Sequence, residues 1–239
     1  MQIFLSELIG TAILILLGDG VCCNVSLNKS GQKGAGSIQT GIAWGLAVLL
    51  PAFVFGATSG AHFNPAVTIA LAVNGTVPWS SVPAYLAGEF LGAFLGAALL
   101  VVLFYEQFKA TEDPAVKRGC FCTAPSVRNT PLNFLSEFIC GFLLLFCILG
   151  EGQVAGAAAS GVNYLLTYGI IVSIGMSLGG LTGYAMNPAR DFGPRLAYAV
   201  LPVPGKGDAD MGYAWIPIVA PVLGGVVAAL LYGVLPLAL

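Results

Sequence analysis

The chain is poor in charge. Only 8% of its 239 residues are Asp, Glu, Lys or Arg, whereas about 25% is usual in a soluble domain. So few charges cannot cover the surface of a soluble protein, and hydrophobic residues make up 57% of the chain. The composition therefore predicts an integral membrane protein. The formal net charge of −2 and the lack of a basic cluster indicate no nucleic-acid partner.

Histidine is nearly absent, because His62 is the only one. A membrane enzyme would need a nucleophile, an acid–base pair or a set of metal ligands close together, and the sequence groups none of these. Cys120 and Cys122 lie in a polar connection with one residue between them, a poor match to zinc spacing. The sequence therefore predicts no catalytic residue, no metal site and no cofactor, and it leaves a disulfide at this pair open.

Apolar stretches dominate the rest of the chain. Six of them approach the ~20 residues that are needed to cross a bilayer, and two more are too short to cross alone. The long stretches cover residues 3–21, 38–57, 82–105, 132–149, 164–181 and 215–235, and the short ones cover 65–73 and 188–200. This pattern predicts an all-α membrane protein with six transmembrane helices.

One tripeptide occurs twice, as Asn64-Pro65-Ala66 and as Asn187-Pro188-Ala189. Asn is a strong N-cap, and Pro suits the first helical position because the N–H that it lacks would be unpaired there. Each tripeptide should therefore start one of the short helices. Two helices that begin inside the membrane are re-entrant half-helices, which build binding or permeation sites at the midplane.

The two halves of the sequence resemble each other. Ser6-Glu7 near the start of the first span recurs as Ser136-Glu137 near the start of the fourth. We predict a first repeat over 1–105, a connecting loop over 106–131 and a second repeat over 132–239. Three spans per repeat would invert the second repeat relative to the first, so the two half-helices would enter from opposite faces and meet at their N-termini.

The motif residues can act on a permeating solute. If the side-chain oxygens of Asn64 and Asn187 cap their helices, the amide N–H groups are left as donors for the lumen. The facing helix N-termini add partial positive charge, which repels cations and protons. Arg190 follows the second motif, and a charge inside the membrane is by default a functional hypothesis.

The chain resembles the major intrinsic protein family, which comprises the aquaporins and aquaglyceroporins. The resemblance covers essentially all residues: six spans, two Asn-Pro-Ala motifs, and Glu7 and Glu137 in the first span of each half. Asp191 directly after Arg190 is typical of the glycerol-conducting branch, so the sequence is most similar to bacterial glycerol facilitators.

The resemblance implies a passive channel that conducts glycerol, water and similar small neutral solutes and excludes ions and protons. It implies a multi-pass protein of the bacterial inner (plasma) membrane, embedded in the lipid bilayer as a homotetramer with one pore per chain. Alternatives are a channel mainly for water or for a small neutral acid such as lactic acid, and a coupled secondary transporter. Against the transporter, we expect no pore-facing carboxylate beside the motifs, and the facing positive helix dipoles would oppose a cation.

By resemblance, the selectivity filter consists of Trp44, Gly175, Tyr184 and Arg190. The rings of Trp44 and Tyr184 would face the carbon side of a polyol while Arg190 binds its hydroxyls. Gly175 would leave room where a water-selective channel has a bulky His. Tyr184 departs from the Phe of the best-known glycerol channel, and its hydroxyl is expected to face the solute near Arg190.

Other positions carry over as lining or scaffold. Glu7 and Glu137 would accept hydrogen bonds from the motif loops, and Glu89 stands where the family commonly has Gln, so either packing as a protonated acid or pH gating is open for it. Pore lining is expected at Gly60, Ala61, His62, Gly183 and Ala185, and structural roles at Pro65, Pro188 and Asp191.

Two further features concern orientation and packing. All nine Lys and Arg residues lie in the first, third and fifth connections, which the positive-inside rule assigns to the cytoplasm; the resemblance implies the reverse. The small residues of the third span suit close helix packing. They are Gly88, Gly92, Ala93, Gly96 and Ala97.

Overall fold

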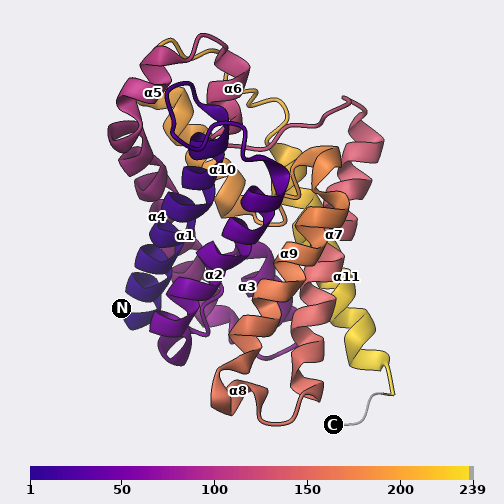
Figure 1. Cartoon of the computed structure of the whole chain (residues 1–239). Coiled ribbons are helices and arrows are strands. Elements are labelled where there is room, and N and C mark those ends of the chain that lie inside the picture. Colours follow the sequence, from indigo (N-terminus) through magenta and orange to yellow (C-terminus); the bar gives the residue numbers. More distant parts are fainter. Residues whose placement is uncertain (237–239) are drawn as a thin grey trace.

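The computed structural model describes residues 1–236, which form helices and connections without a strand (Figure 1). Six of the helices are long and apolar enough to cross a membrane, which confirms the predicted spans. They are α1 (Gln2–Ser26), α2 (Gly36–Ser59), α4 (Val82–Leu103), α7 (Thr130–Gly150), α9 (Val162–Thr182) and α11 (Trp215–Val234).

The two half-helices are α3 (Pro65–Val73) and α10 (Pro188–Val200), and both start at the proline of an Asn-Pro-Ala motif. Their 9 and 13 residues rise about 14 and 20 Å at about 1.5 Å per residue, less than the ~30 Å hydrocarbon core. Figure 1 shows α3 in the lower half of the molecule and α10 in the upper half. Neither crosses the membrane alone.

Short helices lie in the connections between these longer elements. They are α5 (Tyr105–Ala110), α6 (Pro114–Gly119), α8 (Ala157–Ser160) and the 3₁₀ turns η1 (Trp79–Ser81) and η2 (Glu151–Gln153). The start of α6 has a clear cause, because Asp113 accepts a hydrogen bond from the Ala115 N–H at 2.8 Å and Pro114 takes the first helical position.

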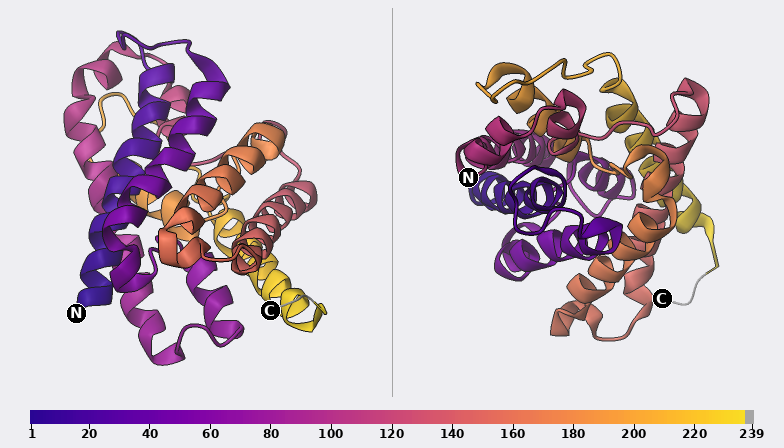
Figure 2. Two further views of the ribbon diagram at one scale, coloured as in Figure 1. Left: turned by 60° about the horizontal axis from the view of Figure 1, so that its bottom comes forward. Right: turned by 45° about the horizontal axis from the view of Figure 1, so that its top comes forward.

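The helices pack as an inverted repeat. In the first half α1 packs on α2 and α4, and in the second half α7 packs on α9 and α11. Each half-helix packs mainly on the last span of the other half, so that α3 lies on α11 and α10 lies on α4. The two views of Figure 2 show the halves side by side. The division at residues 105 and 131 stays a prediction, and residues 237–239 of the second repeat lie outside the described part.

The small residues of α4 bring it very close to α1. A Cβ added to Gly92 would lie 2.2 Å from the Leu8 carbonyl oxygen, and one added to Gly96 would lie 2.5 Å from that of Ala12. In the second half, a Cβ on Gly224 would lie 2.1 Å from a carbonyl oxygen of α7. The small-residue stripe therefore serves helix packing within one chain and does not mark a contact between subunits.

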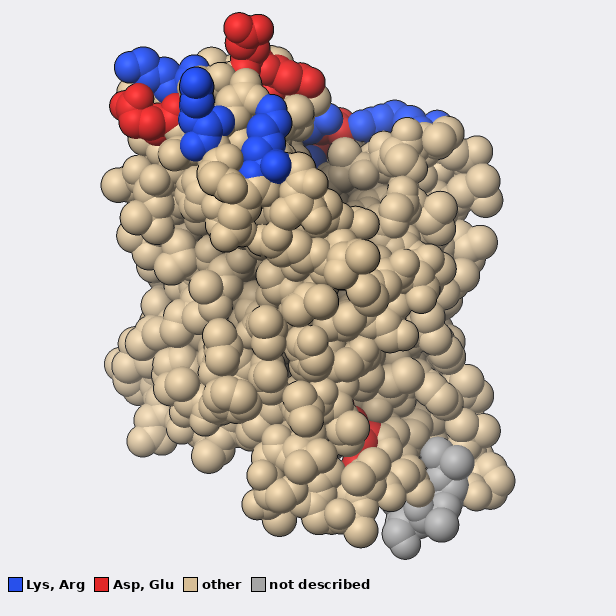
Figure 3. All heavy atoms as spheres, in the orientation of Figure 1, with Lys and Arg blue, Asp and Glu red and all other residues tan. Residues whose placement is uncertain are grey.

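Charge gathers at one end of the molecule. Figure 3 shows the Lys and Arg side chains of the visible face at the end that carries α5 and α6, which we call the charged end. The opposite end carries α8, the start of α1 and the end of α11 (Figure 1). The positive-inside rule and the family resemblance thus assign opposite sides of the membrane to the charged end.

Candidate pore and selectivity filter

The two half-helices begin at symmetrical caps. The Asn64 side-chain oxygen accepts a hydrogen bond from the Ala66 N–H at 2.9 Å. The Asn187 oxygen accepts from the N–H groups of Ala189 at 3.0 Å and Arg190 at 3.1 Å. Pro follows each Asn at the first helical position. The helix N-termini, with their partial positive charge, therefore face the middle of the molecule.

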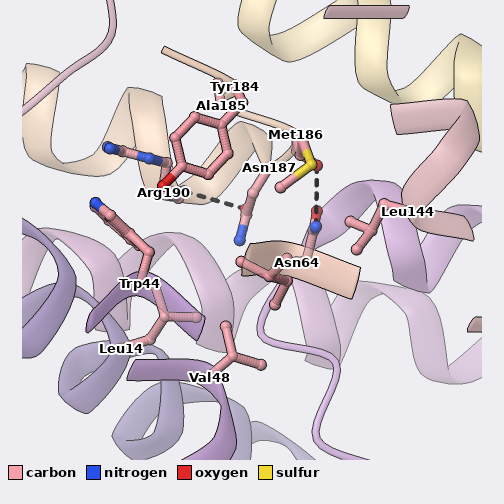
Figure 4. A pocket seen from close by; sticks show the side chains of 11 residues that line it. Leu14, Trp44, Val48, Asn64, Leu144, Tyr184, Ala185, Met186, Asn187 and Arg190 are labelled. Carbon is pink, nitrogen blue, oxygen red and sulfur yellow. Dashed lines mark hydrogen bonds between the residues drawn. The ribbon is translucent and has the colours of Figure 1, made fainter. Parts of the chain in front are cut away.

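The amide nitrogens of the two caps join the halves. Asn64 Nδ2 donates to the Met186 carbonyl at 3.0 Å, and Asn187 Nδ2 donates to the Phe63 carbonyl at 2.7 Å. Figure 4 shows both side chains on the central cavity. The sequence assigned both N–H groups of each amide to the lumen, whereas the structure uses one of them between the halves and leaves one for a solute.

A buried Glu in the first span of each half holds each motif loop. Glu7 accepts hydrogen bonds from the N–H groups of His62 at 3.2 Å and Phe63 at 2.6 Å. Glu137 accepts from the N–H groups of Ala185 at 3.0 Å and Met186 at 3.1 Å. Each also accepts a hydrogen bond from a hydroxyl group at the end of the helix that leads into its motif loop. The two acids satisfy backbone donors that lipid could not.

The motif loops have an irregular backbone. In the first loop φ is 84° at Gly60, 56° at Ala61 and 50° at Phe63, and the second loop repeats this with 86° at Gly183 and 37° at Tyr184. Such values are uncommon for residues other than Gly and cluster at functional sites. The predicted lining residues Gly60, Ala61, His62, Gly183 and Ala185 all border the cavities described next.

Three adjoining cavities run along the molecule. The upper vestibule, of about 410 Å³ at the charged end, is lined by Cys22, Arg118 and residues of α9. The lower vestibule, of about 260 Å³, is lined by His62, Glu151 and residues of α9. Between them lies a central cavity of about 50 Å³. The path is therefore wide at both ends and narrow in the middle.

The constriction between the upper vestibule and the central cavity is formed by Trp44, Tyr184 and Arg190, which line both (Figure 4). The Arg190 guanidinium carbon lies 4.0 Å from the centre of a Trp44 ring. A Cβ on Gly18 would lie 2.3 Å from Trp44 Cζ3, so glycine there makes room for the indole. Three of the four predicted filter residues thus meet where the upper vestibule joins the central cavity.

Gly175, the fourth predicted filter residue, lines the upper vestibule but does not widen the constriction. A Cβ at Gly175 would lie 2.7 Å from Tyr184 Cζ, because the Tyr184 ring packs against the glycine. The Tyr184 hydroxyl is buried and has no hydrogen-bond partner among the described residues. The expectation that this hydroxyl faces the solute is therefore not met: the ring fills the space that Gly175 leaves.

Asp19 is a site residue that the sequence reasoning missed. It is fully buried in α1, and its Oδ1 lies 3.3 Å from Arg190 Nη1. Ionisable side chains inside membrane spans are rare and costly, so an acid placed there indicates a function. Arg190 Nη1 also donates to the Phe121 carbonyl at 3.5 Å. The sequence feature that could have identified Asp19 is its position as a single acid between two glycines, Gly18 and Gly20.

The neighbouring acid Asp191 is bound to other groups. Its carboxylate accepts hydrogen bonds from the Thr123 N–H at 2.8 Å and the Thr123 hydroxyl at 2.7 Å. Arg195 Nε lies 2.8 Å from its Oδ1, and both side chains are fully buried. Asp191 thus anchors α10 to the loop before α7, a structural role.

His62 and Glu89 belong to one buried network. His62 Nδ1 lies 2.8 Å from the Thr68 hydroxyl, which donates to Glu89 Oε1 at 2.8 Å. Glu89 Oε1 also accepts the Asn64 N–H at 3.2 Å. Glu89 is therefore a third acid that supports a motif loop, and it reaches His62 through one hydroxyl although the two are distant in sequence.

The loop cysteines are buried free thiols, and Cys122 lines the upper vestibule. Cys120 Sγ donates to the Val116 carbonyl and Cys122 Sγ to the Arg118 carbonyl, each one turn back. Burial raises the pKa of the Cys122 thiol above its ordinary value. A buried thiol with a raised pKa is a poor nucleophile, so Cys122 is a packing residue.

The fold and the site together define a membrane channel, because six spans surround a path whose middle is built by two half-helices. Comparison with known proteins identifies its family. A family model described as major intrinsic protein matches residues 1–232. The chain belongs to the major intrinsic protein family. This confirms the expectation of a channel in place of an enzyme.

Two relatives and one solved structure give the detail. A probable glycerol uptake facilitator protein of Thermotoga maritima is 50% identical over 97% of this chain and 98% of its own length. The glycerol uptake facilitator protein of Bacillus subtilis is 48% identical over 97% of this chain and 84% of its own length. An X-ray structure of the aquaglyceroporin from Plasmodium falciparum has a TM-score of 0.83 and 30% identity, covering 98% of this chain and 96% of that one. The six spans and the bacterial relatives identify a multi-pass protein of a bacterial plasma membrane.

Proposed function

We propose that this protein is a passive channel for glycerol, water and similar small neutral solutes. The observation that carries the proposal is the constriction, where Trp44 and Tyr184 present apolar rings and Arg190 presents hydrogen-bond donors. A polyol has one apolar and one hydroxyl-rich side, and the constriction matches both. The relatives that are named glycerol uptake facilitators support this substrate class.

Arg190 supplies the polar side of the filter. Within the described residues, both hydrogen bonds of its guanidinium use Nη1. Nε and Nη2 are left to donate to a solute hydroxyl that has lost its water. One step further along the path, the remaining N–H of Asn64 and of Asn187 donates to the next solute oxygen. A dehydrated solute thus exchanges water contacts for protein contacts of similar strength.

Exclusion of ions and protons follows from the two half-helices. Their N-termini meet at the Asn64 and Asn187 caps, and each contributes roughly half a positive elementary charge. A cation in the central cavity would meet two like charges and would find donors where it needs acceptors. The midplane of the path therefore favours neutral oxygen-bearing solutes over cations.

Assembly is a further part of the proposal. Each chain holds a complete path between its own two half-helices, so association is not required to form the pore. By family resemblance we propose a homotetramer in the lipid bilayer, with four independent pores.

The deciding experiment measures solute flux into liposomes that contain the purified protein. Stopped-flow light scattering would follow glycerol, lactic acid and water gradients separately. We expect fast glycerol flux that is proportional to the protein content. Protein-dependent water flux without glycerol flux would replace this proposal with a water channel. A protein-dependent proton current under a pH gradient would favour a coupled transporter.

A further inference from the structure

The buried acid Asp19 faces the cation of the filter. It lies in the C-terminal half of α1, and its Oδ1 is 3.3 Å from Arg190 Nη1. Its other oxygen, Oδ2, is buried and has no hydrogen-bond partner among the described residues. The negative charge of this carboxylate is therefore directed at Arg190 and is not shared among several donors, as the charges of Glu7 and Glu137 are.

The charges around the constriction form two separate pairs. Asp191 is bound by Arg195 and by both donors of Thr123, so it has little capacity left for another cation. Asp19 is the carboxylate that remains for Arg190. The filter thus carries a guanidinium and a carboxylate in contact, and its local charge is neutral.

Asp19 lies behind the filter and does not line it. Trp44, Tyr184 and Arg190 border the cavities, whereas Asp19 is fully buried. Arg190 is held between the indole of Trp44 and the carboxylate of Asp19. Asp19 therefore acts through Arg190, as a positioning and charge-setting residue.

We propose that Asp19 determines the specificity of the filter by making Arg190 unavailable to carboxylate anions. A guanidinium is the preferred partner of a carboxylate in proteins, and the attraction is strong where water is excluded. An unpaired Arg190 at the constriction would hold a passing organic anion and block the path. With Asp19 already paired to it, Arg190 still donates to hydroxyls but gains little from a second carboxylate. This inference rests on the proposed function as a glycerol channel.

The test is inhibition of glycerol flux by a small carboxylate. Glycerate has nearly the shape of glycerol and is an anion at pH 7, so it is the probe, present at equal concentration on both sides of the liposome membrane. Asp19→Asn keeps the shape and one acceptor oxygen but removes the charge. We expect the parent to be insensitive to glycerate, and D19N to be inhibited with at least about tenfold tighter apparent binding of glycerate.

Three variants separate charge from structure. Glu112→Gln removes one exposed acid at the same end of the molecule and should stay insensitive. Asp19→Glu keeps the carboxylate and should also stay insensitive. The double variant with D19N and Arg190→Gln should lose the sensitivity that D19N gained, because the cation is gone.

The outcomes are distinct. Glycerol flux in D19N that glycerate does not reduce, in protein that elutes like the parent, would overturn the inference and leave the channel proposal intact. Inhibition of the parent by glycerate would overturn it as well, and this arm needs no variant to fold. If the parent conducts no glycerol, the proposed function itself fails.

Discussion

The hydroxyl of Tyr184 offers a sharp test of the filter. Because it is buried without a partner among the described residues, its removal in Tyr184→Phe should stabilise the protein. An unsatisfied buried hydroxyl costs about 1–3 kcal/mol. In a chain of this size, about 1 kcal/mol corresponds to roughly 2–4 °C in the unfolding midpoint. We therefore expect the midpoint of Y184F in mild detergent to rise by at least about 2 °C.

A matched control is available in Tyr198, which is fully buried. Its hydroxyl donates to the Pro114 carbonyl at 3.2 Å and accepts from the Gly207 N–H at 2.9 Å. Tyr198→Phe loses both bonds, each with a net value of about 0.5–1.5 kcal/mol, so its midpoint should fall. Opposite signs for the two variants are the prediction. A fall in Y184F as well would show that the Tyr184 hydroxyl has a partner and that the reasoning is wrong.

The same variant tests the role of the hydroxyl in transport. Since the Tyr184 ring lines the path but its hydroxyl is buried, Y184F should keep the ratios between the rates for glycerol, dihydroxyacetone and lactic acid at low pH. The glycerol rate itself should hold or rise. A selective loss of the more oxygenated solutes would mean that the hydroxyl contacts the permeant.

Three further predictions concern size, assembly and orientation. Gly175→His should reduce glycerol flux much more than water flux, because the new side chain would push the Tyr184 ring into the path; equal losses in a light-scattering assay would contradict the filter assignment. Mass spectrometry from mild detergent should show a tetramer, and monomer alone would count against it. If the charged end is outside the cell, as the family implies, a membrane-impermeant amine reagent on intact cells should label the exposed Lys33 and Lys109; labelling only after lysis would favour the positive-inside assignment.

The sequence predicted the helices well where the physics is local. Span length, the Asn-Pro caps and the repeat of Glu7 as Glu137 depend on neighbouring residues or on simple recurrence. The two half-helices therefore begin and end at the predicted residues. The six spans differ from prediction only at their ends, where helices fray or extend into the connections.

The site was predictable only in part, because several of its contacts join distant segments. The contact between Asp19 and Arg190 spans 171 positions, and that between Asn187 and Phe63 spans 124. Gly175 shows the same limit: a small residue marks free space in a sequence, but the structure fills that space with Tyr184. The network of Glu89 likewise depends on how α4 packs beside the first motif loop.

The exchange of packing partners between the halves bears on how the protein is made. Synthesis completes α3 early, and Glu7 can hold the first motif loop from within the same half. The helix on which α3 mainly packs, α11, is synthesised much later, and so is Asn187, which bonds to Phe63. A nascent chain that ends after α4 therefore has three inserted spans and a loop without its counterpart. We therefore expect the central cavity to form only after α10 and α11 have entered the membrane and packed on α4 and α3.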